Sequence, residues 1–247
     1  QQVQETMTQL WWRLQAVRYV RQRDFPEAFS SFRTAGVSLP WAHDGEGGHA
    51  QSAMRAGLLL RDNLLHRARI EKAYLKAIAA ARHEVVIANA YFLPGRRLRR
   101  ALVMAVQRGV RVRLILQGRY DYFMQYHAVR PVYGTLLAAG VEIHEYTASF
   151  LHAKVAVVDA RHDRPWATVG SSNLDPLSLL LAREANVVVA DQGFATQLQL
   201  RLEEIMAGQC VAVSAQSVAQ RSWHQRLRDR VAFGLMRLAL FLSGNRY

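Results

Sequence analysis

The stretch His152-Ala153-Lys154-Val155-Ala156-Val157-Val158-Asp159 predicts a mostly apolar β-strand that carries an imidazole and an ammonium group two residues apart. Side chains two apart in a strand point to the same face, so we expect His152 and Lys154 to enter one pocket. Asp159 has the opposite parity, and we therefore expect it to support the following turn or hold the strand rather than act on a substrate. A lysine beside a histidine on a buried-looking strand indicates a site that handles phosphate.

A second polar motif, Gly170-Ser171-Ser172-Asn173, follows a predicted turn and return strand. Ser171 and Asn173 carry a hydroxyl and an amide that can donate hydrogen bonds to anionic oxygens. Glu184 and Asn186 then begin another predicted strand, two apart and on one face. A carboxylate near a histidine fixes its tautomer and raises its basicity, and Glu184 is the best candidate for this role.

Together these groups suit the chemistry of a phosphodiester. The imidazole of His152 would attack phosphorus and form a phosphohistidine, while a second acid protonates the leaving alcohol. Lysine, serine and asparagine donors would stabilise the charge on the non-bridging oxygens. The sequence has no H-E-x-x-H motif and no Asp/His cluster at metal-ligand spacing, so we expect no metal and no other cofactor.

Predicted helices and strands alternate around the two motifs. The expected helices cover residues 64–82, 96–108, 129–139 and 195–206, and the expected strands cover 84–90, 110–117, 141–146, 151–159, 166–170 and 185–190. Gly109 and Gly140 follow two of these helices, as is common at helix ends. This alternation predicts an α/β domain with helices on both faces of a central sheet.

The N-terminal part of the chain differs from this pattern. Residues 3–23 carry apolar positions at helical spacing, and residues 25–53 are irregular, with several glycines and prolines. The chain opens on Gln1 rather than on methionine. We therefore expect residues 1–54 to be the tail and linker of a preceding lobe, and residues 55–220 to be one catalytic lobe.

The C-terminal part is basic and then apolar. Residues 231–242 (VAFGLMRLALFL) are almost continuously apolar and follow several arginines. A simple bilayer crossing needs about 20 apolar residues, so this run is too short. We expect residues 221–247 to form an amphipathic helix in the membrane interface; the alternative is a helix docked on the domain's own core.

The composition supports a large core and an anionic partner. Hydrophobic residues make up 51% of the 247 residues, and the formal net charge is +13 with a pI of about 10.6. Such an excess of positive charge favours nucleic acid or an acidic membrane surface, without distinguishing them. The single cysteine, Cys210, excludes a disulfide within the chain.

The two motifs, H-x-K-x4-D and G-S-x-N, resemble the signature of the phospholipase D superfamily. Within it the chain is most similar to the bacterial cardiolipin synthases of the B type. The matching segments are residues 87–95 (IANAYFLPG), 109–112 (GVRV), 116–118 (LQG) and 166–178 (WATVGSSNLDPLS). The resemblance covers roughly residues 55–240 and is to the second half of a two-lobed chain. It implies a layered α-β-α sandwich with a mixed central sheet.

The resemblance also implies an activity and a set of site residues. The activity would be phosphatidyl transfer, which makes cardiolipin from phosphatidylglycerol at the cytoplasmic side of the bacterial inner membrane, with the protein attached peripherally. The implied catalytic motif residues are His152, Lys154, Asp159, Ser171, Asn173 and Glu184, and the implied lipid-headgroup residues are Asn89, Tyr91 and Phe92. A further aromatic group either lines a substrate channel or packs a loop: Tyr120, Tyr122, Phe123 and Tyr126.

The chain departs from the family in having one H-x-K motif. None of its other histidines is followed two residues later by lysine. We expect the partner group to come from a missing N-terminal lobe, or from a homodimer in which two His152 rings face one phosphate. Two other functions stay open: a nuclease of the same superfamily, although nucleic acid is the less expected partner, and a lobe that binds acidic lipid without turnover.

Overall fold

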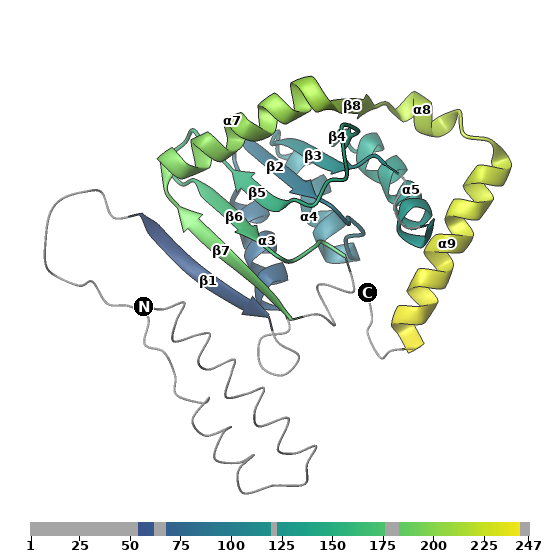
Figure 1. Ribbon diagram of the computed structural model, residues 1–247, viewed down its shortest axis with the longest axis horizontal. Coiled ribbons are helices and arrows are strands. Elements are labelled where there is room, and N and C mark those ends of the chain that lie inside the picture. Colours follow the sequence, from purple (N-terminus) through teal and green to yellow (C-terminus); the bar gives the residue numbers. More distant parts are fainter. Residues whose placement is uncertain (1–53, 62–67, 120–122, 176–182, 243–247) are drawn as a thin grey trace, which may run out of the picture. The chain divides into compact units, whose positions relative to one another are not determined.

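The structure, a computed structural model, describes residues 54–61, 68–119, 123–175 and 183–242. The chain divides into two units, Gln1–Ala53 and Met54–Tyr247, and the N-terminal helix and linker expected before residue 54 lie outside the described residues. The second unit is built on an eight-stranded sheet with the order β1-β7-β6-β5-β2-β3-β4-β8 (Figure 1). Parallel and antiparallel pairs both occur in it, so the expected mixed α/β sheet is confirmed.

The elements follow the predicted alternation. The strands are β1 Arg55–Arg61, β2 Glu84–Asn89, β3 Arg111–Gln117, β4 Glu142–Tyr146, β5 Lys154–Val158, β6 Trp166–Gly170, β7 Glu184–Ala190 and β8 Cys210–Val213. The helices are α3 Arg69–Ala80, α4 Arg96–Gln107, α5 Phe123–Ala138, α7 Gln192–Gln209, α8 Ala215–Ala219 and α9 Trp223–Leu242.

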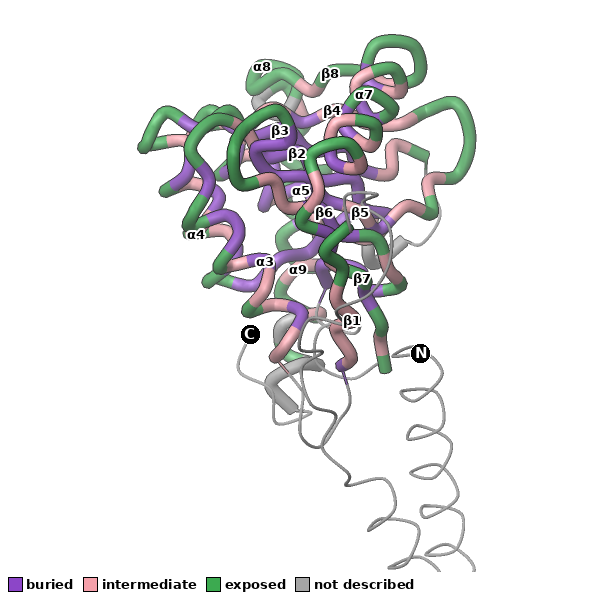
Figure 2. Tube along the Cα trace, turned by 90° about the vertical axis from the view of Figure 1, so that its left-hand side faces the viewer, coloured by how far each residue is buried: buried purple, intermediate pink, exposed green. Residues whose placement is uncertain are grey.

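Helices cover both faces of the central strands because those strands are apolar on both sides. Val85 and Ile87 of β2 enter one core with α3, α4 and α5, whereas Val86 and Ala88 enter a second core with α7. This is the period of two expected for a strand. Figure 2 shows the resulting continuous burial along β2 and β3. A strand buried on both faces gives an unbroken apolar run, which is why these strands were predictable.

Three elements differ from the sequence-based expectations. The edge strands β1 and β8 were not predicted, because each has one neighbouring strand and neither shows a clear alternation. Helix α5 begins at Phe123 rather than near residue 129, and Pro131 lies inside it. Strand β5 begins at Lys154, so His152 lies in the preceding loop and not in the strand. The last hydrogen bond between the β2 segment and the β5 segment runs from Ala90 N–H to Ala153 O, at 2.9 Å.

Helix α9 is docked on α5 through one of its faces. The His127 Nδ1 of α5 lies 2.6 Å from Asp229 Oδ1 of α9, and Asp229 also pairs with Arg221 at 3.1 Å. Phe233 and Met236 pack against the core on the same side. One face of α9 is therefore covered by α5. No helix within the described ranges is both long enough and apolar enough to cross a membrane.

Candidate active site

The motif residues gather at one edge of the sheet because of the strand directions. β5 runs antiparallel to β2 and β6, and β7 runs antiparallel to β6. The carboxyl ends of β2 and β6 therefore meet the amino ends of β5 and β7, with Asn89 opposite Lys154 and Gly170 opposite Asn186. Such an edge, outside the carboxyl ends of strands, is where α/β sheets bind ligands.

Hydrogen bonds join the loop after β2 to the loop after β6. The Asn89 carboxamide Oδ1 accepts from Leu174 N–H at 3.0 Å, and Leu93 N–H donates to Leu174 O at 2.9 Å. The Asn173 Oδ1 accepts a longer bond, 3.4 Å, from Tyr91 N–H. Asn89 and Asn173 thus hold backbone in place, and Tyr91 is fixed beside the G-S-x-N motif.

The turn between β6 and β7 pairs the two remaining polar motifs. The Ser171 hydroxyl donates to the Glu184 carboxylate. The Asn186 Oδ1 accepts from Ser172 N–H at 3.3 Å. A Cβ at Gly170 would collide with the Asn186 carboxamide, so only glycine allows this close approach. The glycine of G-S-x-N and the asparagine of E-x-N therefore depend on each other.

Lys154 supplies a buried positive charge at this edge. Its side chain is only 7% exposed. Desolvation lowers the pKa of Lys154, and the nearby carboxylates of Glu184 and Asp175 partly oppose that shift. Its Nζ donates to the backbone carbonyl of His152 at 3.2 Å. The ammonium is thus placed between the His152 loop and two carboxylates, where it can meet an anionic substrate oxygen.

His152 is exposed and lies in the loop before β5. The Glu184 carboxylate is paired here with Ser171, so its expected action on the His152 ring stays a prediction.

Asp159 lies at the other end of β5, away from this edge. Its carboxylate accepts three backbone hydrogen bonds, from Arg82 N–H at 2.8 Å, His83 N–H at 2.9 Å and Glu84 N–H at 2.8 Å. Its φ of 48° is in the left-handed region, which aspartate tolerates better than most residues. The side chain joins the turn after β5 to the start of β2; Asp159 and His152 both lie outside β5, so the parity argument does not apply to them.

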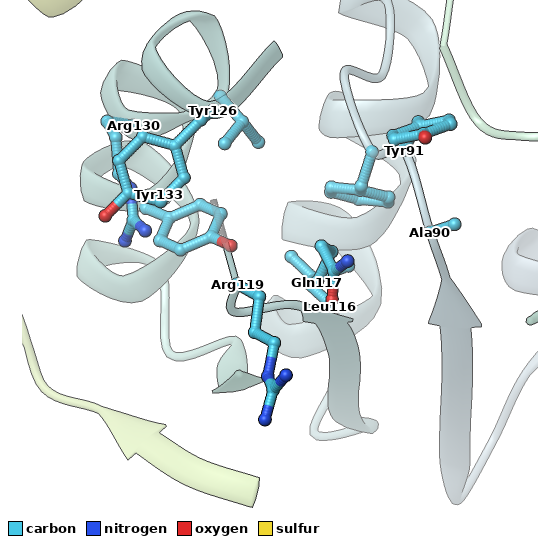
Figure 3. Close-up of a pocket in the computed structure, with 10 residues that line it drawn as sticks. Ala90, Tyr91, Leu116, Gln117, Arg119, Tyr126, Arg130 and Tyr133 are labelled. Atoms are coloured by element: carbon cyan, nitrogen blue, oxygen red, sulfur yellow. The ribbon is translucent and has the colours of Figure 1, made fainter. Parts of the chain in front are cut away.

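An open pocket of about 420 Å³ lies beside this edge, between α5 and the ends of β2 and β3 (Figure 3). Its wall includes Tyr91 and Phe92, for which the family resemblance implies a headgroup role that stays a prediction, and Tyr126 from the aromatic group. The other lining residues are Ala90, Leu116, Gln117, Arg119, Val129, Arg130 and Tyr133. Tyr120 and Tyr122 lie outside the described residues, and so does the side chain of Phe123.

Sequence reasoning missed two residues on the α5 side of the pocket, Arg130 and Tyr133. Tyr126, Arg130 and Tyr133 follow one another at spacings of four and three, which places them on one helix face. The Arg130 guanidinium lies 4.4 Å from the Tyr126 ring centroid and 5.0 Å from that of Tyr133. The spacing could have predicted that these three side chains share a helix face, but the helix was expected to begin only near residue 129, after Tyr126.

Residues 74–206 match the family model described as "Cardiolipin synthase, PLD-like domain". The chain is 45% identical over 180 residues to cardiolipin synthase B of Escherichia coli (strain K12), which is 73% of this chain and 43% of that protein. It is 41% identical over 195 residues to cardiolipin synthase B of Salmonella typhi, covering 79% of this chain and 46% of the relative. The chain therefore spans less than half the length of these relatives.

Two solved structures share the fold. Nuc from Salmonella typhimurium, a phospholipase D family member, superposes with a TM-score of 0.54 at 19% identity and covers 66% of this chain and 99% of its own. Phosphatidylserine synthase from Haemophilus influenzae gives a TM-score of 0.62 at 11% identity and covers 88% of this chain and 54% of its own. At these identities the similarity concerns the fold alone.

Proposed function

The chain belongs to the PLD-like domain family of cardiolipin synthases, and from this membership we propose that it is one catalytic lobe of a phosphatidyltransferase that makes cardiolipin from phosphatidylglycerol. The observation that carries the proposal is the meeting of H-x-K, G-S-x-N and E-x-N at one sheet edge, around the buried ammonium of Lys154. The product, cardiolipin, comes from the names of the relatives, and the donor, phosphatidylglycerol, comes from the family resemblance of the sequence motifs.

The proposed reaction has two steps. The His152 imidazole attacks the phosphorus of one phosphatidylglycerol, the bond from phosphorus to the glycerol oxygen breaks, and a second group protonates that oxygen. The hydroxyl of another phosphatidylglycerol then gives its proton to the same group and attacks phosphorus, and the bond to His152 breaks. Lys154 and the amide N–H groups of Asn173 stabilise the charge on the non-bridging oxygens, while Ser171 holds the Glu184 carboxylate.

The second group must lie on the opposite side of phosphorus from His152, because attack and departure are in line. One imidazole cannot occupy both sides. We therefore propose that a second H-x-K lobe completes the site, either from sequence preceding this chain in a longer protein or from a second copy. The first arrangement is favoured by the resemblance to a two-lobed chain, and the two are distinguished by activity of the 247-residue chain alone.

We also propose that α9 contacts an acidic membrane with the face that is not docked on α5. Five large apolar side chains of α9 are each more than half exposed: Trp223, Leu227, Val231, Leu235 and Leu238. At 100° per residue they fall within an arc of about 120°. Exposed arginines border this arc on both sides, Arg226 and Arg230 on one and Arg228 on the other. An apolar stripe between arginines suits the boundary of anionic headgroups and acyl chains.

The function is tested by incubating the chain with phosphatidylglycerol vesicles, alone and with a co-expressed lobe that carries the other H-x-K, and measuring cardiolipin and released glycerol. We expect product from the pair and almost none from the chain alone. The matched control is the pair with His152→Ala. Cleavage of single-stranded DNA with no cardiolipin formed would replace the proposal with a nuclease. Turnover by the chain alone as a dimer would replace the second lobe with a second copy.

A further inference from the structure

We propose that the pocket between α5 and the ends of β2 and β3 binds the glycerophosphate headgroup of the acceptor lipid, the one whose hydroxyl receives the phosphatidyl group. This inference rests on the proposed function, because an acceptor is needed only if His152 carries a phosphatidyl group. It adds a second lipid site, distinct from the motif edge that holds the reacting phosphorus.

The charges around the pocket match one phosphodiester. As far as the chain is described, its lining includes two arginines and no carboxylate (Figure 3). Arg130 is already paired with Glu145 at 2.8 Å and is enclosed by two tyrosine rings, so its charge is largely balanced. Within the described residues, Arg119 forms hydrogen bonds to backbone carbonyls and no ion pair with a carboxylate. The described lining therefore carries a net charge near that of one cation, the complement of one singly charged phosphodiester.

Two side chains have N–H groups that form no hydrogen bond within the described residues and that such a ligand could accept from. Arg119 donates from Nε to Thr147 O at 2.9 Å and from Nη2 to Ala148 O at 2.8 Å, which leaves Nη1. Gln117 uses its Oε1 to accept from Leu151 N–H at 3.1 Å, which leaves the two N–H groups of its Nε2. A guanidinium and an amide together can donate to a phosphate oxygen and to a glycerol hydroxyl.

The same hydrogen bonds place the pocket beside His152. They hold the loop from Thr147 to Leu151, and His152 is the next residue. On its other side the loop is fixed by the bond from Ala90 N–H to Ala153 O, and Ala90 also lines the pocket. A headgroup in the pocket would thus touch the residues that position the nucleophile's loop, and its hydroxyl would lie near the phosphorus on His152.

The walls suit the rest of a headgroup. Tyr91, Phe92, Tyr126 and Tyr133 present aromatic surface from two sides, which packs against the C–H groups of glycerol. In the second step the headgroup's primary hydroxyl attacks phosphorus, its proton passes to the second group, and the electron pair of the broken P–N bond returns to the His152 ring.

The test is isothermal titration of the 247-residue chain with deacylated phosphatidylglycerol, and separately with inorganic phosphate and with glycerol. We expect saturable binding of the deacylated lipid that is clearly tighter than binding of phosphate or glycerol. Arg119→Ala should weaken it about tenfold or more, since a charge-assisted bond is lost. Val129→Phe should weaken it similarly by filling the pocket without changing charge, which keeps the test valid if Arg119→Ala disturbs the loop.

Two further variants locate the binding event. Arg164→Ala removes an exposed arginine of the turn between β5 and β6 and should leave binding unchanged. Lys154→Ala removes the ammonium at the motif edge, and binding of the deacylated lipid in the pocket should persist. The inference is overturned if phosphate binds as tightly as the deacylated lipid, if no saturable binding occurs, or if only Lys154→Ala weakens it. Headgroup binding without any cardiolipin formation by the two-lobe pair would instead refute the proposed function and with it the acceptor role.

Discussion

Replacing Asp159 with asparagine tests whether this motif residue stabilises the fold or takes part in the chemistry. In the native protein Oδ2 accepts from Arg82 N–H at 2.8 Å, and Oδ1 accepts from both His83 N–H and Glu84 N–H. Asparagine can keep the two bonds to its oxygen, but its NH₂ group then faces the Arg82 N–H, donor against donor. Asparagine tolerates the left-handed φ of 48° as well as aspartate does, so no backbone strain is added.

The expected cost follows from these contacts. Hydrogen bonds to a charged group contribute about 1.5–3 kcal/mol each, and an unsatisfied buried donor costs about 1–3 kcal/mol. The substitution removes one such bond and weakens two, so we expect the free energy of unfolding to fall by about 2–3 kcal/mol. For a folded unit of this size each kcal/mol lowers the melting temperature by about 2–4 °C, which predicts a decrease of about 4–12 °C.

The measurement is thermal unfolding followed by circular dichroism, with Asp163→Asn as the control. Asp163 lies in the same turn, is exposed, and undergoes the same charge change. The control should melt within about 1 °C of the wild type. An equal melting temperature for the two variants would refute the argument from the three hydrogen bonds. A stable Asp159→Asn protein that loses phosphatidyl transfer would give Asp159 a chemical role instead.

Four further outcomes are expected. In the two-lobe pair, His152→Ala should abolish cardiolipin formation with an unchanged melting temperature, because the side chain is exposed; near wild-type transfer would exclude it as the nucleophile or acid. Leu227→Ser with Leu235→Ser should release the protein from acidic vesicles and spare the fold, since both side chains are more than half exposed, and undiminished co-sedimentation would argue against the interfacial face. Desolvation raises the pKa of Glu203, but hydrogen bonds from a glutamine and two arginines outweigh it and lower the pKa from 4.5 to about 2. Stability from this group is therefore present above about pH 4.5 and lost as the pH falls toward 2, and Glu203→Gln should flatten that part of the pH–stability curve; identical curves would contradict this. EDTA should leave turnover unchanged, and a loss restored by a divalent ion would show that a metal takes part.

The sequence by itself determined the central sheet and the residues of the two motifs. Strands such as β2 and β3 are buried on both faces and therefore read as short apolar runs, while α4 shows its buried positions at helical spacing. Asp159 itself lies just after β5, in a turn with a left-handed φ, so strand alternation did not set the direction of its side chain. Strand alternation does apply to Glu184 and Asn186, which β7 presents two apart.

Only the tertiary structure decided what these residues contact. The hydrogen bonds of Asp159 reach 75 to 77 residues back along the chain, and Asn89 contacts Leu174 85 residues away. The pocket joins α5 to the loop after β2, and β1 and β8 become strands only by pairing with β7 and β4. Periodicity reports which face of an element is apolar. It carries no information on which distant element covers that face, because the partner is selected by packing and hydrogen bonding over the whole fold.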